Sequence, residues 1–253
     1  MSLFANIQGT GPETIVLLHG VGGSHAVWAD IVPQLATEAG LIAYDLPGHG
    51  ASLEAESARS PKRMAEAILA DLVERGIGRA HLVGHSMGGA IATLIALADP
   101  DRFASLTLLA PGGYGEEIDA DLLRRFAAAE DPDEIRACLA AMSGPGHIVS
   151  DRIVADAMAM RARPGQLKKL REIVATIAKG GRQGVIPADL LAKLTMPVAV
   201  AWGVLDSVLP VSQADTLPDR FDLHLVPVAG HMLPDEAPGL IVELLRGIIR
   251  NSV

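Results

Sequence analysis

Cysteine and long apolar runs are both scarce in this chain. Cys138 is the one cysteine among 253 residues, so no internal disulfide can form, and a reducing compartment is the expected location. No apolar run reaches the roughly 18 residues that a membrane span requires, and the first residues lack the basic and apolar segments of a secretory signal. We therefore expect a cytoplasmic protein that has no membrane as a partner.

Basic residues and metal-ligand patterns are also few. The 21 Lys and Arg residues are outnumbered by 30 Asp and Glu residues, which gives a formal net charge of −9. Because a phosphate backbone repels an acidic chain, nucleic acid is not expected as a partner. The sequence has no His-x-Glu-x-x-His pattern and no carboxylates at metal-binding spacing, so neither a metal nor another cofactor is expected.

Apolar residues, in contrast, make up 49% of the chain, which is enough for one large core. Short apolar runs typical of buried strands occur at 14–18, 80–83, 105–110 and 196–202. Helix patterns occur at 26–39, 61–75 and 238–249. This alternation predicts an α/β protein with a parallel sheet that helices cover on both faces.

The strand patterns are interrupted between residues 112 and 195. Helix-forming segments punctuated by proline and glycine take over there. We predict a core formed by residues 1–111 and 196–253 and a helical cap formed by residues 112–195. A cap of this kind would exclude water from a site beneath it and shape its specificity.

The most informative motif is Gly84-His85-Ser86-Met87-Gly88-Gly89, which lies between a strand pattern and a helix pattern. A serine at such a sharp turn has a strained backbone and an exposed hydroxyl, and small neighbours let the strand and the helix approach closely. The amide of Met87, at the helix start, would face an oxygen of any group that the serine attacks. The motif therefore predicts that Ser86 is a nucleophile.

Three further segments supply the partners that a nucleophilic serine needs. His19-Gly20-Val21-Gly22-Gly23 follows the first buried strand and offers a second amide, that of Val21. Asp206 follows the strand at 196–202, and His231 follows the apolar segment 225–228. A histidine can accept the serine proton, and a carboxylate can fix its tautomer and stabilise its charged form. We predict these roles for His231 and Asp206.

The order serine, acid, histidine resembles the α/β-hydrolase family. The resemblance covers nearly the whole chain, from His19-Gly20 through the segment 45–50 and the serine turn to Gly230-His231. It implies a mostly parallel twisted sheet with helices on both faces and a helical cap insertion. It also implies Ser86 as nucleophile, His231 as base, Asp206 as acid, and the amides of Val21 and Met87 as oxyanion hole.

Within that family, segments 81–90 and 106–115 resemble the hydrolase-like domain of acetoin dehydrogenase acetyltransferase (E2) subunits. Gly180-Gly181-Arg182-Gln183 is similar as well. Those subunits carry a lipoyl domain before the hydrolase-like part, whereas this chain begins almost at its first strand. Acyl transfer to a lipoyl arm would then need an arm supplied by a separate protein.

Other residues compete for some of these roles. Glu116 follows the strand at 105–110 and is an alternative acid, because relatives can take the acid from that strand. His19, His49 and His85 are expected near the site, where hydrogen bonding that shapes loops is favoured over proton transfer. Apolar cap side chains would either line an acyl pocket or pack in the core, with packing favoured: Phe126, Met142, Met158 and Met160.

The leading hypothesis is a serine hydrolase that cleaves a small to medium carboxylic ester, thioester or lactone through an acyl-enzyme. One alternative is hydrolysis of a carbon–carbon bond in a ring-cleavage product, although such relatives usually have asparagine where this chain has His85. Another is an acyltransferase or binding component of an acetoin dehydrogenase-type system. The expected partner is a small acyl substrate, and a homodimer is compatible with the sequence.

Overall fold

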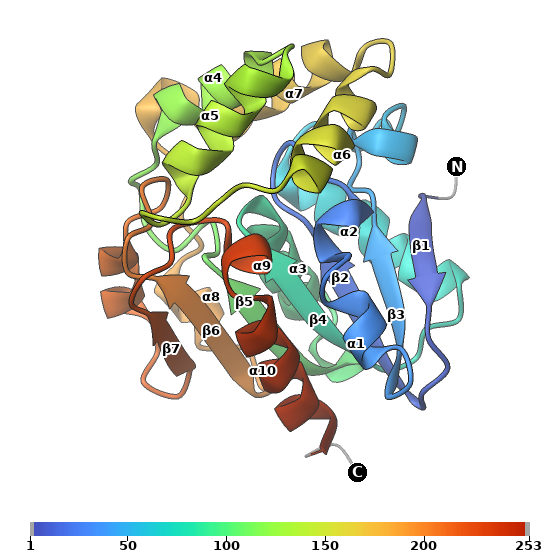
Figure 1. Cartoon of the computed structure of the whole chain (residues 1–253). Coiled ribbons are helices and arrows are strands. Elements are labelled where there is room, and N and C mark those ends of the chain that lie inside the picture. The colour runs from blue at the N-terminus through green and yellow to red at the C-terminus, as the bar shows by residue number, and fades with distance from the viewer. Residues whose placement is uncertain (1–2, 251–253) are drawn as a thin grey trace.

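A seven-stranded sheet forms the centre of the molecule (Figure 1). The structure, a computed structural model, describes residues 3–250. The strands are β1 (Ala5–Gln8), β2 (Glu13–Leu18), β3 (Ala39–Tyr44), β4 (Ala80–His85), β5 (Phe103–Leu109), β6 (Val198–Gly203) and β7 (Asp222–Val226). Their order is β1-β3-β2-β4-β5-β6-β7. β1 pairs antiparallel with β3 and the remaining pairings are parallel, so the predicted, mostly parallel sheet is confirmed.

Helices cover both faces of this sheet. α1 (Val32–Leu35) and α10 (Pro238–Arg250) lie on one face, and α2 (Pro61–Glu74) and α3 (Met87–Ala98) lie on the other (Figure 1). Two short helices, α8 (Ala188–Leu191) and α9 (Leu233–Glu236), complete the core. Because both faces are covered, the central strands are mostly apolar, as in β2, where Ile15 to Leu18 are buried.

Local capping residues explain where α2 begins. The Ser60 hydroxyl accepts a hydrogen bond from the Arg63 amide, and Pro61 occupies the first helical turn, where its missing N–H costs nothing. The predicted helix at 61–75 is therefore confirmed. In α10, the side chains of Ile241, Val242 and Leu245 are buried along one stripe, which agrees with the predicted helix at 238–249.

The predicted helix at 26–39 is wrong. The chain forms a 3₁₀ turn at His25–Trp28 and the four-residue α1, and then Ala39 begins β3. Pro33 has no N–H to continue a helix from the preceding turn. Ala39 pairs with Glu13 of β2, so a residue that the helix pattern had included belongs to the sheet.

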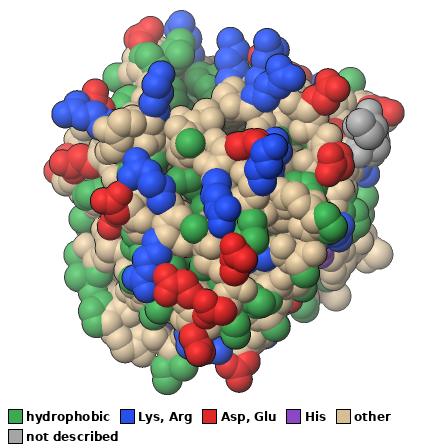
Figure 2. Space-filling model, turned by 90° about the horizontal axis from the view of Figure 1, so that it is seen from above, with side chains coloured by type: hydrophobic (Ala, Val, Ile, Leu, Met, Phe, Trp, Pro, Cys, Tyr) green, Lys and Arg blue, Asp and Glu red, His purple; other side chains and the backbone are tan. Residues whose placement is uncertain are grey.

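Four helices lie above the carboxyl ends of the strands (Figure 1). They are α4 (Ala120–Ala128), α5 (Pro132–Met142), α6 (Asp151–Arg161) and α7 (Gln166–Ile177). Seen from above, Lys and Arg side chains alternate with Asp and Glu over this face (Figure 2). Some form ion pairs between helices, such as Arg125 with Glu134 at 2.5 Å. Whether residues 112–195 form a separate unit stays a prediction.

Candidate active site

Ser86 lies at a sharp turn between β4 and α3. Its backbone has φ 55° and ψ −122°, a conformation that L-residues rarely adopt. The turn is tight because a Cβ on Gly84 would lie 2.3 Å from the Gly88 carbonyl oxygen, and a Cβ on Gly88 would lie 2.3 Å from that of Leu18. Only glycine fits at these two positions, and the result is a serine held at the carboxyl edge of the sheet.

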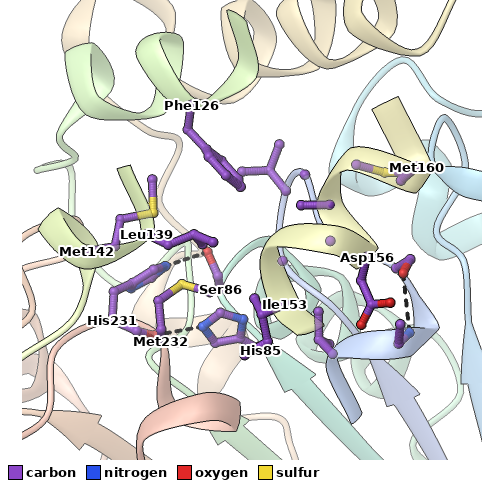
Figure 3. A pocket seen from close by; sticks show the side chains of 18 of the residues that line it. His85, Ser86, Phe126, Leu139, Met142, Ile153, Asp156, Met160, His231 and Met232 are labelled. Carbon is purple, nitrogen blue, oxygen red and sulfur yellow. Dashed lines mark hydrogen bonds between the residues drawn. The ribbon is translucent and has the colours of Figure 1, made fainter. Parts of the chain in front are cut away.

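The three residues predicted as a catalytic group lie within hydrogen-bonding distance of one another. The Ser86 hydroxyl donates to His231 Nε2 over 2.9 Å (Figure 3). His231 Nδ1 in turn donates to Asp206 Oδ2 over 2.8 Å. A carboxylate can only accept, so the proton of a neutral imidazole lies on Nδ1 and Nε2 is free to accept from the serine. All three side chains are buried.

Asp206 is fixed by its own hydrogen bonds. Its Oδ1 accepts from the amides of Val208 and Leu209, each over 2.8 Å, in the loop that follows β6. Glu116, the alternative acid, instead forms an ion pair with Arg182 at the surface. The structure therefore brings Asp206, and not Glu116, to the imidazole.

The two residues predicted to supply the oxyanion-hole amides lie beside one of the cavities at the serine. Val21 and Met87 both line a cavity next to Ser86, and Met87 is the first residue of α3. Within residues 3–250, the structure assigns no acceptor to either amide. The Met87 amide is a donor at a helix start and has no partner inside the helix, so it remains available for the oxygen of a bound group.

Three buried histidines connect the loops around the site. His85 Nε2 donates to the His231 carbonyl oxygen over 2.8 Å. His49 Nε2 accepts from the Gly22 amide over 3.1 Å. His19 Nε2 accepts from the Leu46 amide over 3.0 Å. Burial lowers the pKa of His19 to about 4 and the pKa values of His49 and His85 to about 3. They are therefore neutral at pH 7.

Glu236, which no sequence motif pointed to, holds the loop that carries His231. Its Oε2 accepts from the amides of Gly144 and Gly230 over 2.7 and 2.8 Å, and its Oε1 accepts from the Met232 amide over 2.8 Å. One carboxylate thus joins this loop to the segment between α5 and α6. These contacts join residues far apart in the chain, so they become visible only in the fold.

Ser86 lines two cavities in the described part of the chain. The first, which we call the narrow cavity, has a volume of about 60 Å³ and also contacts His85 and His231. Its apolar wall comes largely from α4, α5 and α6 and includes Phe126, Leu139, Met142, Ile153 and Met160 (Figure 3). Of the four apolar residues considered from sequence, Phe126, Met142 and Met160 line this cavity and also belong to the buried core, and Met158 packs against the core without lining the cavity. The favoured expectation of packing is therefore confirmed.

The second, which we call the wide cavity, has a volume of about 380 Å³. It shares Val21, Ser86 and Leu123 with the narrow cavity and extends along α3 past Leu94 towards Leu190 of α8. The charges around the two cavities differ. Asp156 and two histidines line the narrow cavity, no ionisable side chain lines the wide one, and among the residues lining either there is no Lys or Arg.

Residues 3–250 hold no group of three or more His, Cys, Asp or Glu side chains that could bind a metal ion. No helix among them is both long and apolar enough to cross a membrane.

Comparison with known proteins agrees with the fold. A model of the alpha/beta hydrolase fold family matches residues 13–143. The chain belongs to this family. A dihydrolipoyllysine-residue acetyltransferase component of an acetoin cleaving system from Pseudomonas putida is 35% identical over 97% of this chain. This α/β hydrolase spans 65% of the length of that relative, and the resemblance to acetoin-system components is confirmed.

Two further likenesses involve hydrolases. A pimeloyl-[acyl-carrier protein] methyl ester esterase from Chromobacterium violaceum is 30% identical, over 91% of each chain. A solved 2-hydroxy-6-oxo-6-phenylhexa-2,4-dienoate hydrolase from Rhodococcus superposes with a TM-score of 0.80, covering 98% of this chain and 99% of that one. Their sequences are 23% identical, so this last likeness shows the shared fold.

Proposed function

We propose that this α/β hydrolase is a serine hydrolase that cleaves a small to medium carboxylic ester, thioester or lactone through an acyl-enzyme. The observation that carries the proposal is the hydrogen-bonded series from Asp206 through His231 to Ser86. It lies beside two cavities with largely apolar linings. A buried serine, imidazole and carboxylate in this arrangement activate a hydroxyl that is otherwise a weak nucleophile.

The proposed reaction has two halves. Ser86 Oγ attacks the substrate carbonyl carbon while His231 Nε2 takes the hydroxyl proton, and the bond to the leaving group breaks as His231 returns that proton to the departing atom. Water then attacks the acyl carbon, again giving its proton to His231. The bond to Ser86 Oγ breaks, the proton returns to Oγ, and a carboxylic acid is released.

The negative oxygen that forms in each half needs stabilisation. The amides of Val21 and Met87 are the donors proposed for it, because both residues line a cavity together with Ser86 and neither amide has an acceptor among residues 3–250. By analogy with other acyl-transfer enzymes, each donor would contribute about 3 kcal/mol to the transition state. Asp206 would stabilise the imidazolium that exists at the same moment.

The charges in the cavities favour an ester over a dienoate. The hydrolase from Rhodococcus acts, by its name, on a dienoate, which is a carboxylate. A carboxylate that is buried without a cation loses its hydration, and nothing offsets the cost in free energy. Neither cavity next to Ser86 is lined by Lys or Arg among the described residues. The esterase from Chromobacterium violaceum, by its name, acts on a methyl ester, and this likeness supports the ester reading.

The deciding experiment compares the wild-type enzyme with Ser86→Ala. We expect the wild type to release nitrophenol from short-chain nitrophenyl esters and to form a covalent adduct with a serine-reactive phosphonate, seen by mass spectrometry. Ser86→Ala should lose the adduct and at least about a thousandfold of the activity. Ser57→Ala, which removes a hydroxyl with no assigned hydrogen bond, is the matched control. Equal activity of wild type and Ser86→Ala, without an adduct, would indicate a binding module.

Acyl transfer is the second candidate, and the 35% identity to an acetyltransferase component favours it. In this reaction a thiol replaces water in the second half. Adding dihydrolipoamide to the ester assay tests it: formation of an acyl-dihydrolipoamide faster than the free acid would identify a transferase. A hydrolase would form the free acid at the same rate with or without the thiol.

A further inference from the structure

The two cavities at Ser86 differ in their relation to His231. The imidazole of His231 lines the narrow cavity and not the wide one, and the same is true of His85. Met87, whose amide is a proposed oxyanion donor, lines the wide cavity alone. A carbonyl group bound at Ser86 therefore has one substituent near the imidazole and the other beside the start of α3.

The chemistry of acylation decides which substituent goes where. When the tetrahedral intermediate collapses, His231 Nε2 must pass its proton to the oxygen or sulfur that leaves. The leaving atom must then lie on the imidazole side of Ser86. The acyl chain, which receives no proton, takes the remaining direction.

We infer that the wide cavity binds the acyl chain and the narrow cavity binds the leaving group, so that the preferred substrates are medium-length, uncharged acyl groups on a slender alcohol or thiol. This inference rests on the proposed serine hydrolase activity. Where Phe126, Met142 and Met160 contact a ligand, it is then the leaving group and not the acyl chain, which was the less favoured alternative from the sequence.

Cavity size sets the expected lengths. A volume of about 380 Å³ falls in the range of small-molecule sites. A volume of about 60 Å³ holds only a few water-sized groups. An acetyl group would leave most of the wide cavity unfilled. Each methylene added to the acyl chain should raise kcat/KM by about fourfold until the cavity is full, because each buries further apolar surface.

The lining of the wide cavity also excludes charged chains. It consists of apolar side chains with a few neutral polar groups, and no ionisable side chain among the described residues contributes to it. A carboxylate at the far end of the acyl chain would lose its hydration without gaining a partner. A methyl ester of a monocarboxylic acid should therefore be cleaved much faster than the half-ester of the dicarboxylic acid of equal length.

A pair of constitutional isomers tests the assignment directly. Methyl heptanoate places the long chain on the acyl side, and hexyl acetate places it on the alcohol side, with the same atoms in each. We expect wild-type kcat/KM, measured by acid release in a pH-stat, to be at least about tenfold higher for methyl heptanoate. Equal values or the reverse preference would overturn the assignment, as would cleavage of nitrophenyl acetate with no cleavage of methyl heptanoate.

Variants separate the two cavities. Leu94, on α3, lines the wide cavity, and Leu97, one turn further along the same helix, lines neither. Leu94→Trp should lower the ratio of kcat/KM for methyl heptanoate to kcat/KM for methyl propanoate at least about tenfold, whereas Leu97→Trp should leave this ratio unchanged. Ile153→Ala, which enlarges the narrow cavity, should raise kcat/KM for hexyl acetate relative to methyl heptanoate.

The control reaction keeps the two proposals apart. If nitrophenyl acetate is cleaved and the phosphonate adduct forms on Ser86, the serine hydrolase proposal stands whatever the isomer pair shows. If methyl heptanoate and hexyl acetate then react equally, the assignment of the cavities alone fails. Loss of both the adduct and nitrophenyl acetate cleavage would contradict the proposed function itself.

Discussion

At the scale of single residues, the carboxylate of Asp206 sets the tautomer of His231. Its Oδ2 accepts from His231 Nδ1, while its Oδ1 is held by the amides of Val208 and Leu209. This arrangement leaves His231 Nε2 as the acceptor that faces the Ser86 hydroxyl. An amide in place of the carboxylate would present a donor to Nδ1 and favour the opposite tautomer.

Asp206→Asn should therefore lower kcat by about ten-thousandfold without unfolding the protein. The physical reason is that an imidazole whose proton lies on Nε2 cannot accept the serine proton at that atom. Ester hydrolysis at pH 7 measures the loss, and circular dichroism checks the fold. Asp235→Asn, at a carboxylate that pairs with His147 instead, is the control, and a comparable loss there would contradict the assignment.

At the scale of elements, Glu236 joins α9 to the loop of His231 and to the segment after α5. A glutamine there could not accept all three backbone hydrogen bonds, because its Nε2 is a donor. Glu236→Gln should lower kcat about tenfold to a hundredfold, since a displacement of about 1 Å at a catalytic group can have that effect. KM should change less than about twofold.

The separation between kcat and KM distinguishes this positioning role from a general loss of stability. Glu243→Gln, at an exposed carboxylate near Arg246, is the matched control and should leave both constants unchanged. A Glu236→Gln enzyme with wild-type kcat would show that the loop of His231 does not depend on this carboxylate.

The same scale shows how far the sequence could predict the structure. Local signals predicted α2, because Ser60 and Pro61 act on the helix that they begin. Ser86 and Asp206 could be identified because each follows a buried strand, and parallel strands present their carboxyl ends at one edge. His231 follows an apolar segment after β7, a strand that is itself exposed or only half-buried. The helix at 26–39 was wrong, because Ala39 belongs to β3 through its pairing with a distant strand.

Other features of the site had no sequence signal. The role of Glu236 depends on Gly144, which is 92 residues away along the chain. The wide cavity arises where α3 faces residues from the segment 118–190, and the narrow cavity arises where residues 20–27 face residues from the segment 123–160. Their shapes depend on how helices pack, and residue spacing does not encode that packing locally.

At the scale of the whole molecule, buried neutral histidines make stability depend on pH. The folded-state pKa values of His19, His49 and His85 are lowered by burial to about 4, 3 and 3, and burial also lowers the pKa of His81. An unfolded histidine has a pKa of about 6.5. At pH values between the folded-state and the unfolded-state pKa, the unfolded protein binds more protons than the folded protein. The contribution of these neutral histidines to the free energy of unfolding is therefore complete above pH 6.5 and is lost as the pH falls.

We expect the free energy of unfolding to be roughly 3 to 4 kcal/mol lower at pH 5 than at pH 6. His25 acts in the opposite direction, because its hydrogen bond to Asp45 raises its pKa. Its contribution is complete below pH 6.5 and is lost at higher pH, so it does not mask the effect. Urea unfolding at the two pH values measures the difference, and equal stabilities would contradict the neutral burial of these histidines.

The connection between the His231 loop and the cap has a consequence for access to the site. The His231 amide donates to the Met142 carbonyl oxygen over 2.7 Å, and Glu236 bonds Gly144 in the same segment. Any outward swing of this segment would break these bonds and loosen the proton acceptor of the serine. Substrate entry and reaction would then exclude each other. While the segment is displaced, Ser86 would lack a positioned imidazole, and it would become reactive only after the segment has returned and excluded bulk solvent.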